Sequence, residues 1–442
     1  MPRTIRSANY TCSSCGASAA TWSGRCNVCG DWNTLEISND SLPSYAKLST
    51  QTIAESVKAK EERLLSGIQG VDQVFGAGIV AGSVNLISGE PGMGKSTILL
   101  QLCAGIAAKH DVLYVSGEES LHQVGMRANR LSVNQKKLKI AASNSTDDIA
   151  KEVESSKFKL VVIDSIQTLR CNEVGSSAGS ISQVTNSSAM LAQAAKNSNT
   201  AIIIVGHITK EGNIAGPKLL EHIVDVVLSL EGDQSGGLKL LRVSKNRFGS
   251  TNETAIFEMK QTGLMPVVNP SAILLAERKI TDGSVVLAAM EGSRPILVEV
   301  QALVNRTSYG YPKRASSGMD LSRLNLLIAM MERRTSLQLN DKDIYVNIVG
   351  GLKINEPASD LAVVMAIASA SRGKKLKDNA VVFGEIGLSG EIRHVPFIEK
   401  RIEEAQAMGF AYAIGPKTPG LKSSSFLHPV TEVKQALNSY LT

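Results

Sequence analysis

Short apolar runs alternate with longer segments of helical period from about residue 63 to about residue 265. Continuous apolar runs bounded by Gly, Asp or Asn predict strands that are buried on both faces. These runs lie at 84–89, 111–117, 159–164, 200–206 and 225–230. Because helical segments separate most of the runs, the pattern predicts a parallel sheet with crossover helices. Pro266 and Pro270 then interrupt it.

A second α/β pattern extends from about residue 272 to the end of the sequence. Its predicted strands lie at 284–290, 296–304, 343–352 and 380–387. Its predicted helices cover Leu321–Arg334, Ser359–Ser371 and Ile398–Met408. This alternation predicts a second α/β domain after the first.

The N-terminal part lacks such a pattern. Residues 1–35 are rich in Cys, Gly and Ser and are too short to form an apolar core, whereas 36–60 are polar and read as a linker. We therefore expect a small module at 1–35 and a linker at 36–62. The first α/β domain is expected at 63–267 and the second at 268–442.

Composition and charge narrow the class of protein. A length of 442 residues is typical of about three domains. The composition, with 43% hydrophobic and 20% charged residues, excludes a disordered chain or a coiled-coil rod. No apolar run is long enough to span a membrane and the start lacks a signal-peptide core, so a cytoplasmic protein is expected. The net charge of +6 permits local nucleic-acid contacts without arguing for them.

One Gly-rich segment predicts phosphate binding. The segment fits the pattern G-x-x-x-x-G-K-[ST] with Gly89, Glu90, Pro91, Gly92, Met93, Gly94, Lys95 and Ser96. It follows an apolar strand and opens a helix at Thr97, which is the context that a P-loop requires and that a chance Gly-rich turn lacks. Backbone N–H groups would surround phosphate oxygens, Lys95 would reach the β- and γ-phosphates, and Ser96 would bind Mg²⁺.

Three acidic residues are candidates for the remaining ATP chemistry. Asp164 ends the apolar run 159–164 and suits a Walker B aspartate that holds Mg²⁺, although any buried strand can end in Asp. Glu118 and Glu119 follow the run 111–117, at the sheet edge where ligands bind in open α/β folds. We take Glu118 as the residue that polarises water and Glu119 as second choice, with a solvated acidic turn as the alternative.

Two further segments carry candidate ligands at strand ends. His207, Thr209 and Lys210 follow the run 200–206 and could sense the γ-phosphate or contact nucleic acid, although a lone His is more often structural. Lys245 and Arg247 share one face of a strand end. They could contact a phosphate in a neighbouring active site or a nucleic-acid backbone, or simply form a basic strand end.

A Gly- and Ser-rich segment at 170–184 follows Asp164. It could line a channel for single-stranded nucleic acid or form an ordinary mobile surface loop. Composition leaves both readings open.

Four cysteines lie close together near the N-terminus. They form a C-x2-C-x10-C-x2-C array of Cys12, Cys15, Cys26 and Cys29. Two such pairs in a segment without a core predict a tetrahedral Zn²⁺ site, and redox-active pairs are the alternative. Trp22, Arg25 and Trp32 could stack on a partner or cover the site.

With these motifs, the chain resembles the RadA (Sms) family of bacterial DNA repair proteins over nearly its whole length. The residues that carry the resemblance are the four-Cys array and 63–97, 112–120, 161–168, 245–249 and 356–369. The resemblance implies a zinc ribbon, a RecA-like ATPase core and a C-terminal Lon-protease-like domain. It also implies a hexameric ring that uses ATP and binds single-stranded and branched DNA. Such a ring would act with a recombinase of the RecA type. It would extend or migrate recombination intermediates in a manner similar to DnaB-type helicases.

The family's functional residues fall on particular positions of this chain. Its phosphate-binding lysine falls on Lys95, its Walker B aspartate on Asp164 and the catalytic glutamate of RecA-like cores on Glu118. Its KNRFG lysine and arginine fall on Lys245 and Arg247. Position 185 departs from the pattern, because Thr stands where the family leads us to expect a basic residue.

The C-terminal region resembles the Lon fold without its Ser–Lys dyad. Ala358 follows Pro357 where Lon has its nucleophile, and Glu399 aligns with the catalytic lysine. Ser359 and Lys400 are one position away, and a one-residue shift on a helix turns a side chain by about 100°. We therefore expect an inactive domain that serves assembly and DNA contact, the latter through 305–314, where cations flank two tyrosines.

The sequence thus predicts an ATP-driven DNA motor. An ATP-dependent protease and a nucleotide-gated scaffold for recombination proteins are the alternatives.

Overall fold

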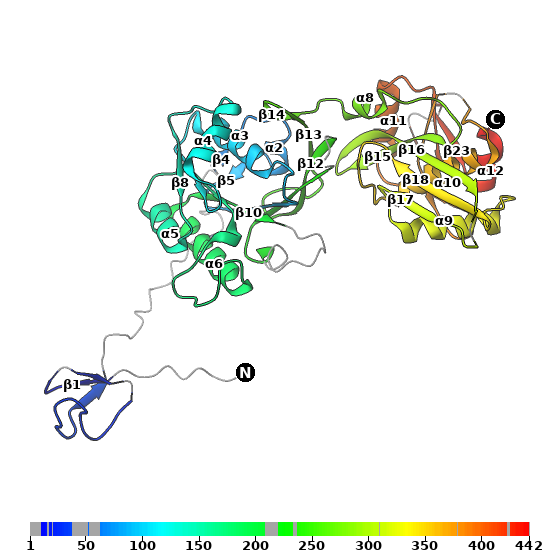
Figure 1. Cartoon of the computed structure of the whole chain (residues 1–442). Helices are drawn as coiled ribbons and strands as arrows, with labels where there is room; N and C mark the ends of the chain where they lie inside the picture. The colour runs from blue at the N-terminus through cyan, green and yellow to red at the C-terminus, as the bar shows by residue number, and fades with distance from the viewer. Residues whose placement is uncertain are drawn as a thin grey trace. The chain divides into compact units, whose positions relative to one another are not determined.

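The computed structural model describes residues 10–15, 17–19, 21–37, 52, 62–207, 220–232, 237–308, 310–377, 379–421 and 425–441 (Figure 1). Contacts between residues divide the chain into two compact units, Met1–Lys60 and Glu61–Thr442. Each unit has its own architecture. Thr209, Lys210 and Tyr309, which the sequence made of interest, lie outside the described residues.

The first unit contains a small antiparallel sheet. Its strands are β1 (Tyr10–Cys12), β2 (Ser18–Ala19) and β3 (Leu35–Ile37), with β1 in the middle. Cys12, Cys26 and Leu35 form its buried cluster. A cluster of this size cannot stabilise a fold by apolar burial alone, so another source of stability is needed.

The second unit begins with a nine-stranded sheet of order β14-β13-β12-β11-β6-β10-β9-β7-β8. The six strands from β11 to β8 are parallel, and β12, β13 and β14 continue the sheet as an antiparallel edge. The strands are β6 (Val84–Gly89), β7 (Val112–Ser116), β8 (Leu138–Ala142), β9 (Leu160–Asp164), β10 (Ala201–His207), β11 (Val226–Gly232), β12 (Leu238–Asn246), β13 (Thr254–Lys260) and β14 (Gly263–Pro266).

Helices cover both faces of this sheet. They are α2 (Val71–Val74), α3 (Lys95–Ala107), α4 (Leu121–Arg130), α5 (Thr146–Ser155), the 3-10 turn η1 (Ile166–Thr168) and α6 (Ile181–Ser198). Successive residues of β9 point to opposite faces, so Val162 packs in the core with α3 whereas Val161 packs in the core with α5 and α6. A short hairpin of β4 (Arg63–Leu64) and β5 (Ile79–Val80) precedes β6.

The C-terminal part of the second unit is built on a seven-stranded sheet of order β17-β18-β16-β15-β19-β22-β23. Its strands are β15 (Ser284–Glu291), β16 (Arg294–Arg306), β17 (Arg314–Ser317), β18 (Lys342–Ile348), β19 (Ala380–Val382), β22 (Tyr412–Pro416) and β23 (Leu427–Val430), and a separate hairpin joins β20 (Glu385–Ile386) to β21 (Ile392–Arg393). Its helical elements are α8 (Pro270–Leu275), α9 (Leu321–Arg334), the 3-10 turn η2 (Pro357–Ser359), α10 (Asp360–Arg372), α11 (Ile398–Ala407) and α12 (Val433–Tyr440).

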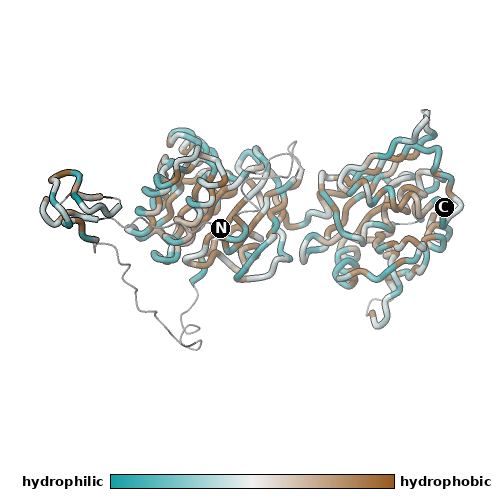
Figure 2. Tube along the Cα trace, turned by 90° about the horizontal axis from the view of Figure 1, so that it is seen from below, coloured by the Kyte–Doolittle hydropathy of each residue, from teal (hydrophilic) through white to brown (hydrophobic). Residues whose placement is uncertain are grey.

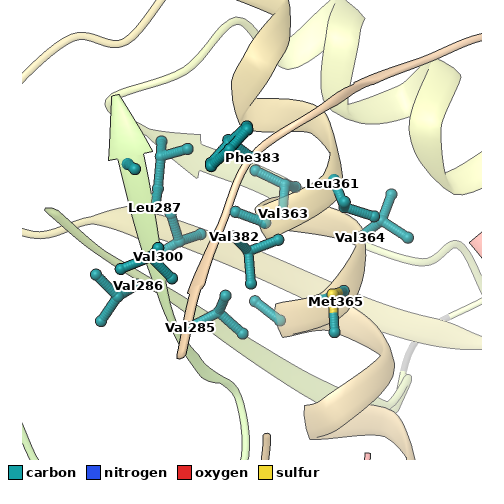
Figure 3. Packing of buried hydrophobic residues seen from close by; sticks show 14 of the residues in the cluster. Val285, Val286, Leu287, Val300, Leu361, Val363, Val364, Met365, Val382 and Phe383 are labelled. Carbon is teal, nitrogen blue, oxygen red and sulfur yellow. The ribbon is translucent and has the colours of Figure 1, made fainter. Parts of the chain in front are cut away.

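The centre of this C-terminal core is the contact of α10 with β15 and β16 (Figure 3). Leu361 and Val364 of α10 are fully buried in the same cluster as Val286 and Val300 of the sheet. Figure 2 shows hydrophobic residues along the inner strands and hydrophilic residues along the outer helices and loops. Leu238 and Ile256 of the nine-stranded sheet belong to this cluster as well, so the two sheets of the unit share apolar contacts.

The long strands and helices expected from the sequence are present. Each apolar run of the first α/β pattern coincides with a strand from β6 to β11, and the three helices expected in the second pattern are α9, α10 and α11. Within the parts of the chain that are described, every helix is too short or too polar to cross a bilayer.

Candidate active site

The P-loop connects β6 to α3 and has the backbone shape that a phosphate cradle requires. Gly92 and Gly94 have φ values of 81° and 99°, which favour glycine. A Cβ at Gly89 would lie 2.5 Å from the carbonyl oxygen of Leu230, and one at Gly94 would lie 2.6 Å from the Cε of Met259. Glycine at these two positions therefore allows the loop to pass close to β11 and β13.

Lys95 begins α3 and reaches back over this loop. Its Nζ donates hydrogen bonds to the carbonyl oxygens of Gly89 at 2.8 Å and Glu90 at 2.9 Å. Burial lowers the pKa of Lys95, and the nearby carboxylates of Asp164 and Glu118 act in the opposite direction. The ammonium group thus lies between the loop and two acidic residues, where a bound phosphate would meet it.

Asp164 ends β9 and is buried. The hydroxyl of Tyr114 on β7 donates a 2.6 Å hydrogen bond to its Oδ2. Burial and the neighbouring Asp164 carboxylate raise the pKa of Tyr114 well above its usual value, so Tyr114 stays a neutral donor. Sequence analysis missed Tyr114, because a tyrosine inside an apolar run has the ordinary pattern of a core residue.

Glu118 and Glu119 have different surroundings, although both follow β7. Glu119 pairs with Arg127 of α4 at 2.5 Å. Oε1 of Glu118 accepts a hydrogen bond of 2.5 Å from Ser165 and lies 3.3 Å from Nε2 of His207. Glu118 therefore belongs to the group around the P-loop, whereas Glu119 is tied to the neighbouring helix.

Ser96 and Asp164 supply the oxygen atoms that Mg²⁺ prefers. A hydroxyl at the start of α3 and a carboxylate at the end of β9 form a hard donor set. The residue types present therefore fit the predicted Mg²⁺, which Ser96 and Asp164 would hold.

Lys245 and Arg247 lie away from the P-loop, toward the amino ends of β6 and β11. Lys245 on β12 pairs in register with Val227, which lies beside Leu86 in the middle of β6, whereas the P-loop leaves β6 at Gly89. The side chains are also engaged locally. Lys245 donates to the carbonyl oxygens of Glu221 at 2.5 Å and Val224 at 2.8 Å.

The guanidinium of Arg247 pairs with Asp225 at 3.0 Å, and Asp225 also accepts a hydrogen bond of 3.0 Å from the N–H of Val84. This ion pair fixes the end of the KNRFG motif against the amino end of β6. No contact within the described part of the chain joins either cation to the P-loop.

The Gly- and Ser-rich segment between η1 and α6 is held by one buried side chain. Gln183 accepts a hydrogen bond from Cys171 N and donates to the carbonyl oxygens of Val174 and Ser176. These hydrogen bonds connect the backbone of the segment to the first turn of α6. Thr185 lies in the first turns of α6, where its hydroxyl donates to Ile181 O.

The four N-terminal cysteines converge on one point. Their sulfur atoms lie within 4.8 Å of one another, with Cys12 and Cys29 3.6 Å apart and Cys15 and Cys26 3.8 Å apart. Thr34 lowers the pKa of Cys12 to about 6 by a side-chain hydrogen bond. Four thiolates at this spacing fit tetrahedral Zn²⁺, which would supply the stability that the small apolar cluster lacks.

Both tryptophans of this unit are largely exposed, whereas Tyr10 packs against the cluster that contains Cys12 and Cys26. Trp22 is 57% exposed and Trp32 is 70% exposed. The guanidinium of Arg25 stacks over the ring of Trp32 at 5.8 Å.

The Lon-like dyad positions are separated and otherwise engaged. Ala358 is buried in η2, and the hydroxyl of Ser359 donates to Glu356 O at 2.8 Å. Lys400 donates to the carbonyl oxygen of Ser293 at 3.0 Å. The described contacts therefore join no hydroxyl to a lysine at this place.

A buried arginine follows Lys400 in sequence and pairs with Glu356, which precedes Pro357. Arg401 is fully buried, and its Nη2 lies 2.6 Å from Oε2 of Glu356. Sequence analysis missed Arg401, since a charged residue on an amphipathic helix normally faces solvent.

Models of known families match three parts of the chain. A model of the AAA domain matches residues 52–213, and a model described as a rubredoxin metal binding domain matches 10–36. A model of subunit ChlI of Mg-chelatase matches 326–419.

Relatives match almost the full chain. A protein of Pseudomonas aeruginosa named DNA repair protein RadA is 44% identical and covers 97% of this chain and 98% of its own. The proteins of the same name from Haemophilus influenzae and Escherichia coli are 44% and 42% identical, each over 92% of both chains. The chain belongs to the RadA family of DNA repair proteins.

Membership in the RadA family confirms the fold class expected from the sequence. The chain combines a RecA-like ATPase domain of the AAA type, an N-terminal four-cysteine ribbon and a C-terminal α/β domain of the ChlI and Lon type. These family matches support nucleotide binding by the ATPase domain and Zn²⁺ binding by the four-cysteine ribbon.

Proposed function

We propose that this RadA-family protein is an ATP-driven DNA motor that binds single-stranded DNA and promotes branch migration and strand extension of recombination intermediates. The observation that carries the proposal is the position of the KNRFG cations. Lys245 lies level with the middle of β6, away from the edge where Lys95 and Asp164 meet. A cation in this position can serve hydrolysis if the nucleotide belongs to a neighbouring subunit, as in ring-forming RecA-like motors.

The proposed hydrolysis uses groups at one sheet edge. Lys95 neutralises charge on the transferred phosphoryl group, and the P-loop amides of 89–97 bind the phosphates. The Mg²⁺ held by Ser96 and Asp164 would offset charge on the β- and γ-phosphates. Glu118 orients and deprotonates the attacking water, because its carboxylate lies near Lys95 and Asp164.

The domains and partners complete the proposal. We assign the zinc ribbon to 1–35, the linker to 36–62, the ATPase domain to 63–267 and the Lon-like domain to 268–442. The active form is a homo-oligomer, most simply a hexameric ring in the cytoplasm, that meets branched DNA and a recombinase of the RecA type.

Strand displacement tests the motor directly. The full-length protein with ATP and Mg²⁺ should displace a strand from a forked DNA substrate, and its ATP turnover should rise with single-stranded DNA. A Glu118→Gln variant should bind the fork and displace nothing. DNA binding without displacement by the wild type would favour the nucleotide-gated scaffold instead.

We also propose that the C-terminal domain is proteolytically inactive. Ser–Lys catalysis needs a hydroxyl within reach of a lysine, and Ser359 and Lys400 each donate to a different carbonyl oxygen. Casein should stay intact with ATP present. Degradation that disappears in Ser359→Ala would establish the protease alternative.

A further inference from the structure

The strand ends around Glu118 are locked together by short contacts. β7 and β9 are paired up to Ser116 and Asp164, and the N–H of Gly117 donates to the carbonyl oxygen of Asp164 at 2.8 Å. A Cβ at Gly117 would lie 2.0 Å from the Oγ1 of Thr168, so η1 packs directly on the turn that carries Glu118. The turn that carries Glu118 is therefore packed closely against η1 and the end of β9.

Ser165 fixes the side chain on this backbone. It is fully buried, and its Oγ donates a 2.5 Å hydrogen bond to Oε1 of Glu118. Nε2 of His207, at the end of β10, lies 3.3 Å from the same oxygen. Both ring nitrogens of His207 are buried and lie outside hydrogen-bond geometry with the described residues, so a rotation of the ring is needed for an N–H to donate to Oε1.

The second carboxylate oxygen has a different environment. The part of the chain that the structure describes provides no hydrogen-bond partner for Oε2 of Glu118, and the Glu118 side chain is 44% exposed. One oxygen is therefore anchored and the other is available to accept a proton. An exposed glutamate without an anchor would sample several rotamers, whereas proton abstraction requires one placement.

We propose that Ser165 is a positioning residue for Glu118 and that His207 completes the anchor, so that Oε1 is held and Oε2 is presented to the attacking water. This inference rests on the proposed role of Glu118 as the base. Ser165 touches neither nucleotide nor metal in this scheme and acts only through Glu118.

Steady-state ATP hydrolysis by the full-length protein with single-stranded DNA tests the proposal. Ser165→Ala should lower kcat about 10-fold to 100-fold, because a displaced catalytic group costs turnover, while KM and the Kd for a fluorescent ATP analogue stay unchanged. Ser83→Ala is the matched control. It removes another buried hydroxyl, bonded at 2.6 Å to Val80 O before the amino end of β6, and should keep kcat within about twofold.

A double-mutant cycle separates positioning from a structural role. Glu118→Gln removes the base, so Ser165→Ala in that background should cause no further loss if Ser165 acts through Glu118. Additive losses, or a Ser165→Ala enzyme as fast as the Ser83→Ala control, would overturn the inference and leave the base role intact. Wild-type turnover by Glu118→Gln would overturn both.

His207 provides variants that leave the buried serine in place. His207→Leu should lower kcat several-fold without changing the nucleotide Kd, and His207→Gln, which keeps an N–H donor, should retain more of the rate. A His207→Leu variant that weakens nucleotide binding at unchanged kcat would show contact with the nucleotide and would overturn the proposed part of His207 in the anchor.

Discussion

Lys95 interacts with its own loop in this structure, since it donates to two carbonyl oxygens of the P-loop. Burial lowers its pKa, and two carboxylates favour its charged form. The same ammonium can shift from the carbonyl oxygens to phosphate oxygens without rebuilding α3. The positive charge of Lys95 therefore contributes to catalysis rather than to the stability of the fold.

Lys95→Ala should lower ATP turnover by about 100-fold or more, because a preorganised cation at the transferred phosphoryl group is lost. Circular dichroism and the thermal unfolding midpoint should stay close to those of the wild type. Lys109→Ala, which removes an exposed lysine just beyond α3, is the control and should hydrolyse ATP normally. Turnover by Lys95→Ala within a few-fold of the wild type would contradict the P-loop assignment.

The buried position of Glu291 leads us to expect that the stability of the fold depends on pH. Burial raises its pKa from 4.5 to about 7, and Arg242, 2.7 Å away, acts in the opposite direction. A folded pKa above the unfolded value means that the native state binds the proton more tightly. The protonated Glu291 side chain therefore contributes to the free energy of unfolding below about pH 4.5. This contribution is lost as pH rises through about 7, and between these two pH values the loss is up to about 1.4 kcal/mol per pH unit.

Urea unfolding at several pH values checks this expectation. From about pH 5 to about pH 8 the free energy of unfolding of the wild type should fall relative to that of Glu291→Gln, whose side chain does not ionise. Parallel pH curves for the two proteins would mean that Glu291 has an ordinary pKa.

Among the elements, the strands buried on both faces were the most predictable from sequence. Continuous apolar runs such as 160–163 have few alternatives to a buried strand, and the P-loop between β6 and α3 adds a fixed motif. The exposed edge strand β8 was missed, because its residues are partly exposed and lack a continuous apolar run. β17 was missed for the same reason.

Residues of the candidate sites could be predicted from the sequence only where a motif fixes both the residue types and the spacing between them. The P-loop residues and the four cysteines follow such spacings. Ser165, Tyr114 and Arg401 do not, because their roles depend on neighbours that are far away in sequence. A motif search therefore finds the groups that touch phosphate or metal and overlooks those that orient them.

The ribbon should depend on its metal. Cys29→Ser should release Zn²⁺ and unfold residues 1–35, since the apolar cluster there is too small to hold the sheet, while ATP hydrolysis persists. Metal analysis and limited proteolysis measure the two effects. Ser14→Ala, which keeps all four thiolates, should retain one Zn²⁺ per chain, and metal-free wild type prepared without chelator would contradict the assignment.

The end of β12 should act on a neighbouring subunit. Mixtures of Lys95→Ala and Lys245→Ala chains should regain part of the ATPase activity, because some interfaces then combine an intact P-loop with intact KNRFG cations. Turnover is measured across mixing ratios. If every mixture equals the sum of its separate components, Lys245 and Arg247 serve DNA contact instead.

The nine-stranded and seven-stranded sheets belong to one compact unit, and Leu238, Leu240 and Ile256 of the nine-stranded sheet pack in the core of the seven-stranded sheet. Arg242 and Glu291 add an ion pair between β12 and β15. Removing the C-terminal domain would expose these apolar side chains and leave Arg242 without its buried partner. Point substitutions on the surface are therefore the cleaner way to test what that domain contributes.

Neutralising the cations around β17 should weaken DNA binding. Arg306 is largely exposed and Tyr311 is 88% exposed, so the segment offers charge and an aromatic face to a nucleic acid. Changing Arg306, Lys313 and Arg314 together to Ala should weaken single-stranded DNA binding and reduce its salt dependence, with DNA-free ATPase unchanged. Fluorescence anisotropy measures binding, and Lys374→Ala with Lys375→Ala is the control. Equal loss in both variants would indicate a general charge effect.

The ion pair of Arg401 with Glu356 bears on how this domain could change during evolution. Both side chains flank the positions where a Lon protease has its serine and lysine. Deleting Arg401 would leave the carboxylate of Glu356 without its ion-pair partner, which is unfavourable. On our proposal that this domain is proteolytically inactive, building a Ser–Lys dyad here would need substitutions at both Ala358 and Glu399, made around this buried pair.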